Sequence, residues 1–151
     1  LNQIIKGRLT NRRIPILVTL CVTNKCNLRC VYCYKENIQA DNHEFTLGQI
    51  LSLVDELACA GTKYISLNGG EALLKDGIDV IVKKIKSKGM LCHLSTNGLL
   101  VKDSIPVLRL VDSLAVSIDG AKASNDANRG KGSYERISQA IELLQNKTLF
   151  C

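Results

Sequence analysis

Aromatic residues and long apolar segments are scarce in this chain of 151 residues. Aromatic residues make up 4% and tryptophan is absent, so a core has to be built mainly from aliphatic side chains. No apolar run reaches the ~20 residues that a membrane-spanning helix needs, which argues against a membrane protein. Because few aromatic residues interleave with the basic ones, the composition also disfavours nucleic acid as a partner.

Signals for secretion are missing as well. The first residues, 1–13, are polar and basic and contain no apolar signal core. The seven cysteines are an odd number, which disfavours a disulfide framework. Together these features predict a reducing, cytoplasmic setting. The chain starts with Leu1 and its single methionine is Met90, which suggests a part of a longer protein.

The residues that are present fit one globular domain. Apolar residues make up 46% of the chain, enough for a core. The net charge is +6, and basic residues gather in two places: Arg8, Arg12 and Arg13, and Lys83, Lys84, Lys86 and Lys88. Two interpretations stay open: a solvated surface with cations near a helix C-terminus, or a patch for an acidic partner such as a leader peptide or an electron donor.

Three closely spaced cysteines are the most informative feature. Cys26, Cys30 and Cys33 form a C-x3-C-x2-C pattern directly after an apolar run, residues 14–22. Three thiolates match three irons of a 4Fe–4S cluster and leave the fourth iron without a protein ligand. An iron with an open site can bind a cofactor or substrate. Lys25 and Arg29 add positive charge that favours the thiolate form.

Other metal sites fit the pattern less well. A ferredoxin-type cluster uses four cysteines with a different local spacing. A structural zinc site needs four ligands. The sequence has no second C-x2-C pair, and His43 and His93 are not at ligand spacing from each other. Zinc stays an alternative. The remaining cysteines are expected to be small buried apolar residues: Cys21, Cys59, Cys92 and Cys151.

Strands and helices alternate along the chain. Apolar runs predict strands at residues 14–22, 64–67, 91–95 and 113–118, with a fifth beginning at Lys147. A 3.6-residue period predicts helices around residues 47–58, 78–85 and 137–144, and more weakly at 104–110. Thr46 and Gln49 form a capping box, and Gly61 and Gly89 stand where helices end. The alternation predicts an α/β fold with a parallel sheet.

Polar and glycine-rich motifs follow the ends of these strands, where parallel α/β folds place their functional sites. The connection of residues 23–45 is unusually long, which suits a loop wrapped around a cluster. The motifs are Asn68-Gly69-Gly70-Glu71, Ser95-Thr96-Asn97-Gly98, Ser117-Ile118-Asp119-Gly120 and Asn125-Asp126-Ala127-Asn128-Arg129-Gly130.

The triad and these motifs, in this order, resemble a radical S-adenosylmethionine (SAM) enzyme. The nearest resemblance is to the branch of the molybdenum-cofactor cyclase, the pyrroloquinoline quinone maturase and SPASM-type relatives. It implies a partial TIM-like (β/α) barrel of parallel strands, truncated here to about four to five β/α units. Residues 1–151 would be the N-terminal part of this core, with the last barrel units and any C-terminal domain absent.

The resemblance also implies cofactors and roles for individual residues. A 4Fe–4S cluster and SAM would be bound, and reductive cleavage of SAM would give a 5′-deoxyadenosyl radical that takes hydrogen from a substrate. No catalytic residue beyond these cofactors is needed. The metal ligands would be Cys26, Cys30 and Cys33. Contacts to SAM would come from Tyr32, Gly69, Gly70, Glu71, Thr96, Asn97, Ser117, Asp119 and Arg129.

Within that set, Tyr32 would meet the adenine, Glu71 with its glycines the methionyl ammonium, and Arg129 the methionyl carboxylate. Each also has an ordinary interpretation as a turn or surface residue. Ala72 stands where relatives often have proline, and Asn125 where they often have histidine. The substrate would be a small molecule or a peptide, and the electron donor a flavodoxin or ferredoxin. A non-catalytic iron–sulfur remnant is the alternative function.

Overall fold

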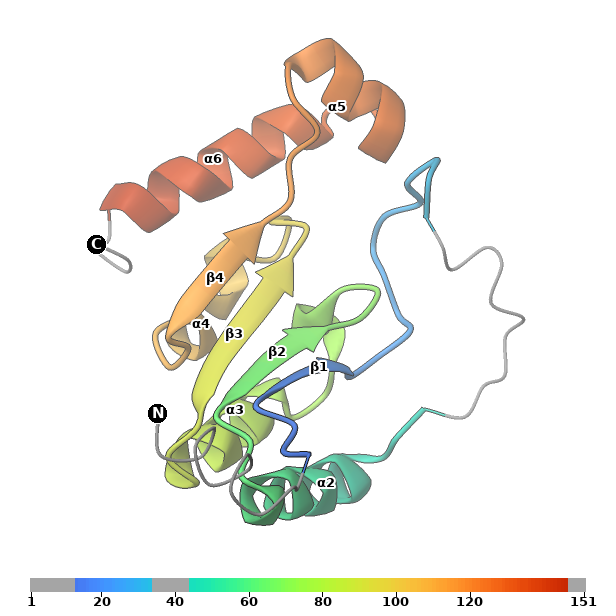
Figure 1. The fold of residues 1–151 in the computed structure, drawn as a ribbon. Coiled ribbons are helices and arrows are strands. Elements are labelled where there is room, and N and C mark those ends of the chain that lie inside the picture. The colour runs from blue at the N-terminus through green and yellow to red at the C-terminus, as the bar shows by residue number, and fades with distance from the viewer. Residues whose placement is uncertain (1–12, 34–43, 147–151) are drawn as a thin grey trace.

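The computed structural model describes residues 13–33 and 44–146. In these residues strands and helices alternate from β1 to α6 (Figure 1). The strands are β1 (Leu17–Cys21), β2 (Tyr64–Asn68), β3 (Leu91–Thr96) and β4 (Ser113–Val116). The predicted strand positions are therefore confirmed, with ends that differ by a few residues. The predicted fifth strand lies outside the described residues.

All strand pairs are parallel, and the order in the sheet is β1-β2-β3-β4. The register aligns Thr19 with Ser66, Ser66 with His93, and His93 with Ser113. Because all four strands are parallel, their carboxyl ends meet at one edge of the sheet. This is the geometry of consecutive β/α units.

The helices are α2 (Leu47–Ala60), α3 (Ile78–Ser87), α4 (Ile105–Leu108), α5 (Lys122–Arg129) and α6 (Ser133–Asn146). The capping box of Thr46 and Gln49 is confirmed, and α2 ends at Gly61 in a left-handed conformation. Helix α5 was not predicted, since its residues carry no apolar stripe and read as a loop. The Asp126 carboxylate of α5 accepts hydrogen bonds from the N–H groups of Gly132 and Tyr134, and these bonds join α5 to α6.

One face of the sheet packs against helices, and α3 and α4 lie behind it in Figure 1. Strand residues Leu20, Ile65, Leu67 and Leu94 share a core with helix residues such as Ile50, Val54, Ile81 and Val82. Alternate strand residues point to the opposite face. That face carries Thr19, Ser66, His93 and Ser113 in one register row. The core is thus aliphatic, as the composition predicted.

The prediction for the scattered cysteines holds only in part. Cys92 is fully buried, as expected. Cys21 and Cys59 are exposed, so the prediction of buried apolar roles was wrong for them. Cys21 neighbours the buried Leu20 and therefore lies on the face of the sheet away from the core. Cys151 lies outside the described residues.

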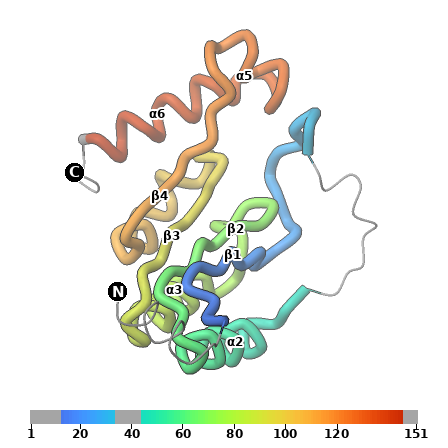
Figure 2. Tube along the Cα trace, in the orientation of Figure 1, coloured from blue at the N-terminus to red at the C-terminus, as the bar shows by residue number. Residues whose placement is uncertain are grey.

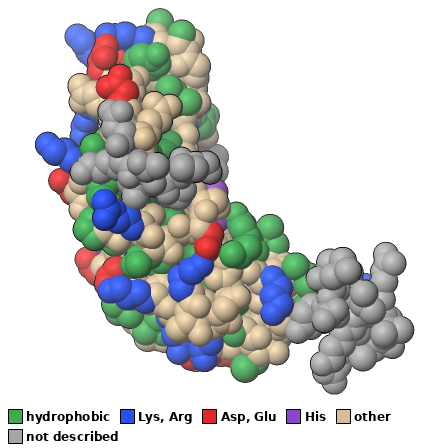
Figure 3. All heavy atoms as spheres, turned by 90° about the vertical axis from the view of Figure 1, so that its left-hand side faces the viewer, with side chains coloured by type: hydrophobic (Ala, Val, Ile, Leu, Met, Phe, Trp, Pro, Cys, Tyr) green, Lys and Arg blue, Asp and Glu red, His purple; other side chains and the backbone are tan. Residues whose placement is uncertain are grey.

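The basic cluster of α3 is matched by carboxylates. Lys83 pairs with Asp79, Lys84 and Lys88 pair with Asp55, and Lys86 pairs with Asp112. Figure 3 shows one face of the molecule, on which basic side chains are scattered rather than gathered in one patch. These pairs favour the interpretation of α3 as an ordinary solvated surface. Among the described residues, no helix combines the length and apolar character needed to cross a membrane.

Candidate functional site

A cavity of about 440 Å³ opens at the carboxyl ends of the strands. Its size is within the usual range of small-molecule sites. All three cysteines of the triad line it, together with seven predicted SAM contacts: Tyr32, Gly69, Gly70, Thr96, Asn97, Ser117 and Arg129. Glu71 and Asp119 do not line it. The lining also includes residues that the sequence analysis did not select: Thr19, Cys21, Leu28, Asn68 and Ser95.

The thiols of Cys26, Cys30 and Cys33 are free and partly exposed. Partial burial raises the pKa of the Cys30 thiol, the other two sulfurs raise it further, and Arg129 opposes the shift. The cation that favours the Cys30 thiolate is therefore Arg129 of α5, whereas Lys25 and Arg29 were expected in that role.

Ligand geometry bears on the zinc alternative. Within residues 13–33 and 44–146, no three or more His, Cys, Asp or Glu side chains converge closely enough to hold one metal ion. A structural zinc ion needs four ligands around a single point, so this alternative gains no support. A cubane cluster puts each thiolate on a different iron and needs the sulfurs around one cavity instead. The assignment of the triad as cluster ligands stays a prediction.

The glycine turn after β2 lies directly against the start of the cysteine loop. Gly70 donates its backbone N–H to the Thr23 carbonyl at 2.9 Å, and the Glu71 N–H donates to the Lys25 carbonyl at 2.8 Å. A Cβ atom on Gly69 would lie 2.5 Å from the Thr23 oxygen, closer than such atoms tolerate. Gly69 is thus required for the approach of the loop backbone, independently of any ligand.

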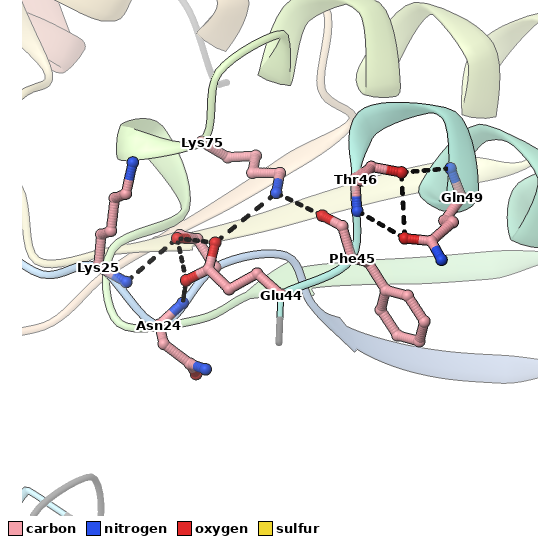
Figure 4. Close-up of polar contacts among 8 residues, drawn as sticks. Asn24, Lys25, Glu44, Phe45, Thr46, Gln49 and Lys75 are labelled. Atoms are coloured by element: carbon pink, nitrogen blue, oxygen red, sulfur yellow. Dashed lines mark hydrogen bonds and ion pairs between the residues drawn. The ribbon is translucent and has the colours of Figure 1, made fainter. Parts of the chain in front are cut away.

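Glu44 closes the base of the same loop (Figure 4). Its carboxylate accepts hydrogen bonds from the Thr23 hydroxyl at 3.0 and 3.1 Å and from the Asn24 N–H. Lys75 lies 3.7 Å from that carboxylate and donates to the Phe45 carbonyl at 2.7 Å. The Asn24 N–H is the main cause of a lowered pKa for Glu44. Nothing in the sequence points to Glu44, because no local pattern links it to residues about twenty positions earlier.

The far part of the loop is anchored to α5, which comes close to it in space (Figure 2). The Val31 N–H donates to the Asn128 carbonyl at 2.9 Å. The Tyr32 hydroxyl donates to Asp119 at 2.7 Å, and the Arg129 guanidinium donates to the other Asp119 oxygen at 2.8 Å. Arg129 also lies over the Tyr32 ring, 5.8 Å from its centroid.

These contacts set the charge states at the rim of the cavity. Desolvation and the bond to Asp119 raise the pKa of Tyr32 to about 12, so its hydroxyl stays protonated. The bond from Arg129 is the main cause of a lowered pKa for Asp119. The Arg129 side chain is only 11% exposed, and its Nε has no hydrogen-bond partner among the described residues. Arg129 is therefore a cavity-lining residue whose guanidinium is held by Asp119 and whose Nε is buried without a partner among the described residues.

Glu71 has a structural environment that the sequence did not suggest. Its side chain is 1% exposed. The carboxylate accepts from the Leu73 N–H at 3.1 Å, the Thr96 hydroxyl at 2.8 Å and the Asn97 N–H at 2.7 Å. It therefore joins the glycine turn to the end of β3. The Asn97 amide in turn donates to Asn27 at 2.7 Å, which extends this connection to the cysteine loop.

Asn125, at the position where relatives often carry histidine, is completely buried. Its side-chain oxygen accepts from the Asp119 N–H at 3.1 Å, and its amide donates to Ser133 at 2.8 Å. It thus fixes the backbone of Asp119 against the start of α6.

A sequence model of the radical SAM superfamily matches residues 20–150. The chain belongs to the radical SAM superfamily. Members of this superfamily are enzymes that use a 4Fe–4S cluster and SAM, so the predicted recognition and cofactors are confirmed at the level of the family. Three thiols and an arginine around one cavity are a set of side chains that fits these two groups.

Curated relatives support the same membership. The chain is 31% identical to the mycofactocin maturase MftC of Mycolicibacterium smegmatis over 136 residues, which cover 87% of this chain and 35% of the maturase. It is 34% identical to a probable GTP 3',8-cyclase of Methanothermobacter marburgensis over 137 residues, which cover 87% of this chain and 45% of the cyclase. The chain therefore spans less than half the length of these relatives.

Solved structures confirm the fold class. The chain aligns with the AdoMet-bound structure of anSMEcpe at a TM-score of 0.73, with 21% identity, covering 88% of this chain and 41% of that one. It aligns with SuiB of Streptococcus suis at a TM-score of 0.75, with 16% identity, covering 96% of this chain and 34% of that one. The predicted partial (β/α) barrel is thus the observed architecture of the described residues.

Proposed function

We propose that residues 1–151 form the N-terminal part of a radical SAM core that holds a 4Fe–4S cluster through Cys26, Cys30 and Cys33 and SAM in the adjoining cavity. One observation carries the proposal: the triad, the glycine turn and the ends of β3 and β4 line the same cavity. Once bound, these cofactors supply reductive cleavage of the SAM carbon–sulfur bond and abstraction of hydrogen from a substrate.

The protein's own residues bind and orient. Arg129 lines the cavity and offers its guanidinium for a charge-assisted hydrogen bond to the methionyl carboxylate. Thr96, Asn97 and Ser117 line the cavity with groups suited to ribose and methionyl atoms. Tyr32 and Leu28 line the same cavity as the triad, and we expect their apolar surface to limit the access of water to a bound cluster. Asp119 acts through Tyr32 and Arg129, which it holds in place.

For Glu71 we propose a smaller part in SAM binding than the sequence suggested. Three donors already occupy its carboxylate, which does not line the cavity. We therefore propose that the methionyl ammonium is received by the backbone of Gly69 and Gly70, with Glu71 contributing its negative charge from behind the turn.

We further propose a peptide or a small molecule as substrate, a flavodoxin or ferredoxin as electron donor, and a reducing cytoplasmic setting. The names of the relatives support both substrate classes: one is a mycofactocin maturase and another a probable GTP cyclase. A structure of anSMEcpe contains a bound peptide.

Anaerobic reconstitution tests the cluster assignment. We expect about four irons and four sulfides per chain, and a change in the EPR signal of the reduced cluster on addition of SAM. Cys30→Ala should lose the cluster. Cys59→Ala is the matched control, because Cys59 is an exposed cysteine of α2 that does not line the cavity. Full cluster yield in Cys30→Ala would contradict the ligand assignment.

A second candidate is a non-catalytic iron–sulfur module. The full occupation of the Glu71 carboxylate favours it, since it removes one predicted SAM contact. This candidate predicts a bound cluster without formation of 5′-deoxyadenosine under dithionite. Detection of that product by chromatography would eliminate it.

A further inference from the structure

A chain of hydrogen-bonded side chains crosses the face of the sheet that is turned away from the helices. His93 Nδ1 lies 2.8 Å from the Ser113 hydroxyl, and His93 Nε2 lies 3.3 Å from the Ser95 hydroxyl. The Tyr64 hydroxyl lies 3.3 Å from the same Ser113 oxygen. The rings of Tyr64 and His93 stack at 6.1 Å with an interplanar angle of 21°. This series of hydrogen bonds reaches the cavity at Ser95, which is one of the lining residues.

The other three residues, Tyr64, Ser95 and Ser113, fix the ring of His93. Each ring nitrogen has a hydroxyl partner, and the stacked tyrosine limits rotation. A position on this face does not need a histidine for packing, because the core lies on the opposite side of the sheet. A ring held at both nitrogens is instead a means of setting which nitrogen carries the proton.

The chemistry of Tyr64 gives the chain a direction. A phenol oxygen shares its lone pair with the ring, so it donates hydrogen bonds better than it accepts them. If Tyr64 donates to Ser113, the Ser113 hydroxyl hydrogen is available for its other partner, Nδ1 of His93 at 2.8 Å, and we take it to be donated there. The proton of the neutral imidazole then lies on Nε2 and is donated to the Ser95 oxygen. Successive bonds of this kind polarise and strengthen one another.

The Ser95 hydroxyl, at the end of this series of hydrogen bonds, is a free donor. Because Ser95 accepts from His93, its own hydroxyl hydrogen is left to point elsewhere, and Ser95 lines the cavity. No Asp, Glu, Lys or Arg side chain bonds to any of the four residues within the described part of the protein. The donor is therefore neutral and suits an acceptor oxygen of a sugar or carbonyl rather than a charged group that needs neutralising.

We propose that His93 is a positioning residue: with its proton on Nε2, it directs the Ser95 hydroxyl as a hydrogen-bond donor to a ribose oxygen of the nucleoside bound in the cavity. Tyr64 and Ser113 set that protonation pattern. The inference rests on the proposed function, because the nucleoside is the adenosyl part of SAM.

Calorimetric binding of S-adenosylhomocysteine to the reconstituted chain tests the inference. In His93→Asn the amide takes the place of Nδ1 and the bond to Ser95 is lost, whereas in His93→Gln the amide reaches the place of Nε2 and keeps it. We expect His93→Asn and Ser95→Ala each to weaken binding about 3- to 10-fold, as for one neutral hydrogen bond. His93→Gln should bind like the parent chain, and the double variant His93→Asn/Ser95→Ala should bind no more weakly than Ser95→Ala.

A second measurement reads the proton directly without changing the network. The chain contains two histidines, so His43→Gln leaves His93 as the single imidazole for ¹⁵N NMR. The expected result is the Nε2–H form. The Nδ1–H form, or independent and additive effects of the two substitutions, would overturn the inference. A parent chain that holds its cluster but binds no S-adenosylhomocysteine would refute the proposed function, and the NMR result would still decide the protonation of His93.

Discussion

Replacement of Glu71 by glutamine is the sharpest test of how the site is built. The carboxylate is buried and accepts three hydrogen bonds, from Leu73, Thr96 and Asn97. Glutamine keeps the shape but turns one acceptor oxygen into a donor. If its oxygen takes the two bonds of Oε1, its amide faces the Asn97 N–H, and that bond is lost.

The expected change in the free energy of unfolding combines two costs and one gain. Loss of a hydrogen bond to a charged group costs about 1.5–3 kcal/mol, and the stranded Asn97 N–H adds about 1–3 kcal/mol. Part of this is offset because a neutral amide is cheaper to bury than a carboxylate. We expect a net loss of about 2–4 kcal/mol in the free energy of unfolding, a large share of the stability of an ordinary domain.

Urea unfolding followed by circular dichroism measures this loss. Glu56→Gln on α2 is the matched control, since Glu56 is exposed and such surface changes stay within about 0.5 kcal/mol. A loss below about 1 kcal/mol for Glu71→Gln would refute the structural role. If the same variant then weakened SAM binding strongly, Glu71 would be a cofactor ligand, as the sequence first suggested.

Three further predictions concern the cysteine loop and the cysteines. Gly69→Ala should lower the iron retained after reconstitution, because its Cβ would displace the Thr23 backbone; Gly48→Ala, in open space, should leave the iron content unchanged. Because the folded-state pKa of Glu44 is lowered, its contribution to stability is present above the unfolded pKa and is lost as pH falls through the folded pKa. Urea midpoints of Glu44→Gln should therefore fall less steeply on acidification than those of the parent chain, and equal slopes would contradict the assignment. Burial raises the pKa of Cys92 to about 12. Iodoacetamide at mildly alkaline pH should therefore label the exposed Cys21 and Cys59 and leave Cys92 unmodified, which mass spectrometry detects. Early labelling of Cys92 would show that β3 is not packed as described.

Features with a local signature were predictable from sequence. The apolar runs gave the strands because a parallel sheet packed against helices buries Ile65, Leu67 and Leu94 completely. The capping box of α2 was recognisable because its two partners are three residues apart. The spacing of the cysteine triad is equally local, and so it pointed to the cavity before the fold was known.

Features that depend on distant partners were not predictable. Glu71 was expected to face a ligand, but two of the three groups that occupy it lie at the end of β3 and just after it, about twenty-five residues later. The exposure of Cys21 depends on which face of β1 meets the helices, and a short apolar run does not reveal that. Nothing near His93 in the sequence indicates Tyr64 or Ser113, since strand pairing alone brings them together.

The anchoring of the cysteine segment at both ends has a consequence for assembly. Its beginning rests on Glu44 and the glycine turn, while its far part is held by Asn128, Asp119 and Arg129. On a ribosome the three thiols emerge long before that second set of contacts exists. Metal insertion is therefore expected to wait until α5 has been synthesised, and a nascent chain stopped before α5 should expose its sulfurs to oxidation.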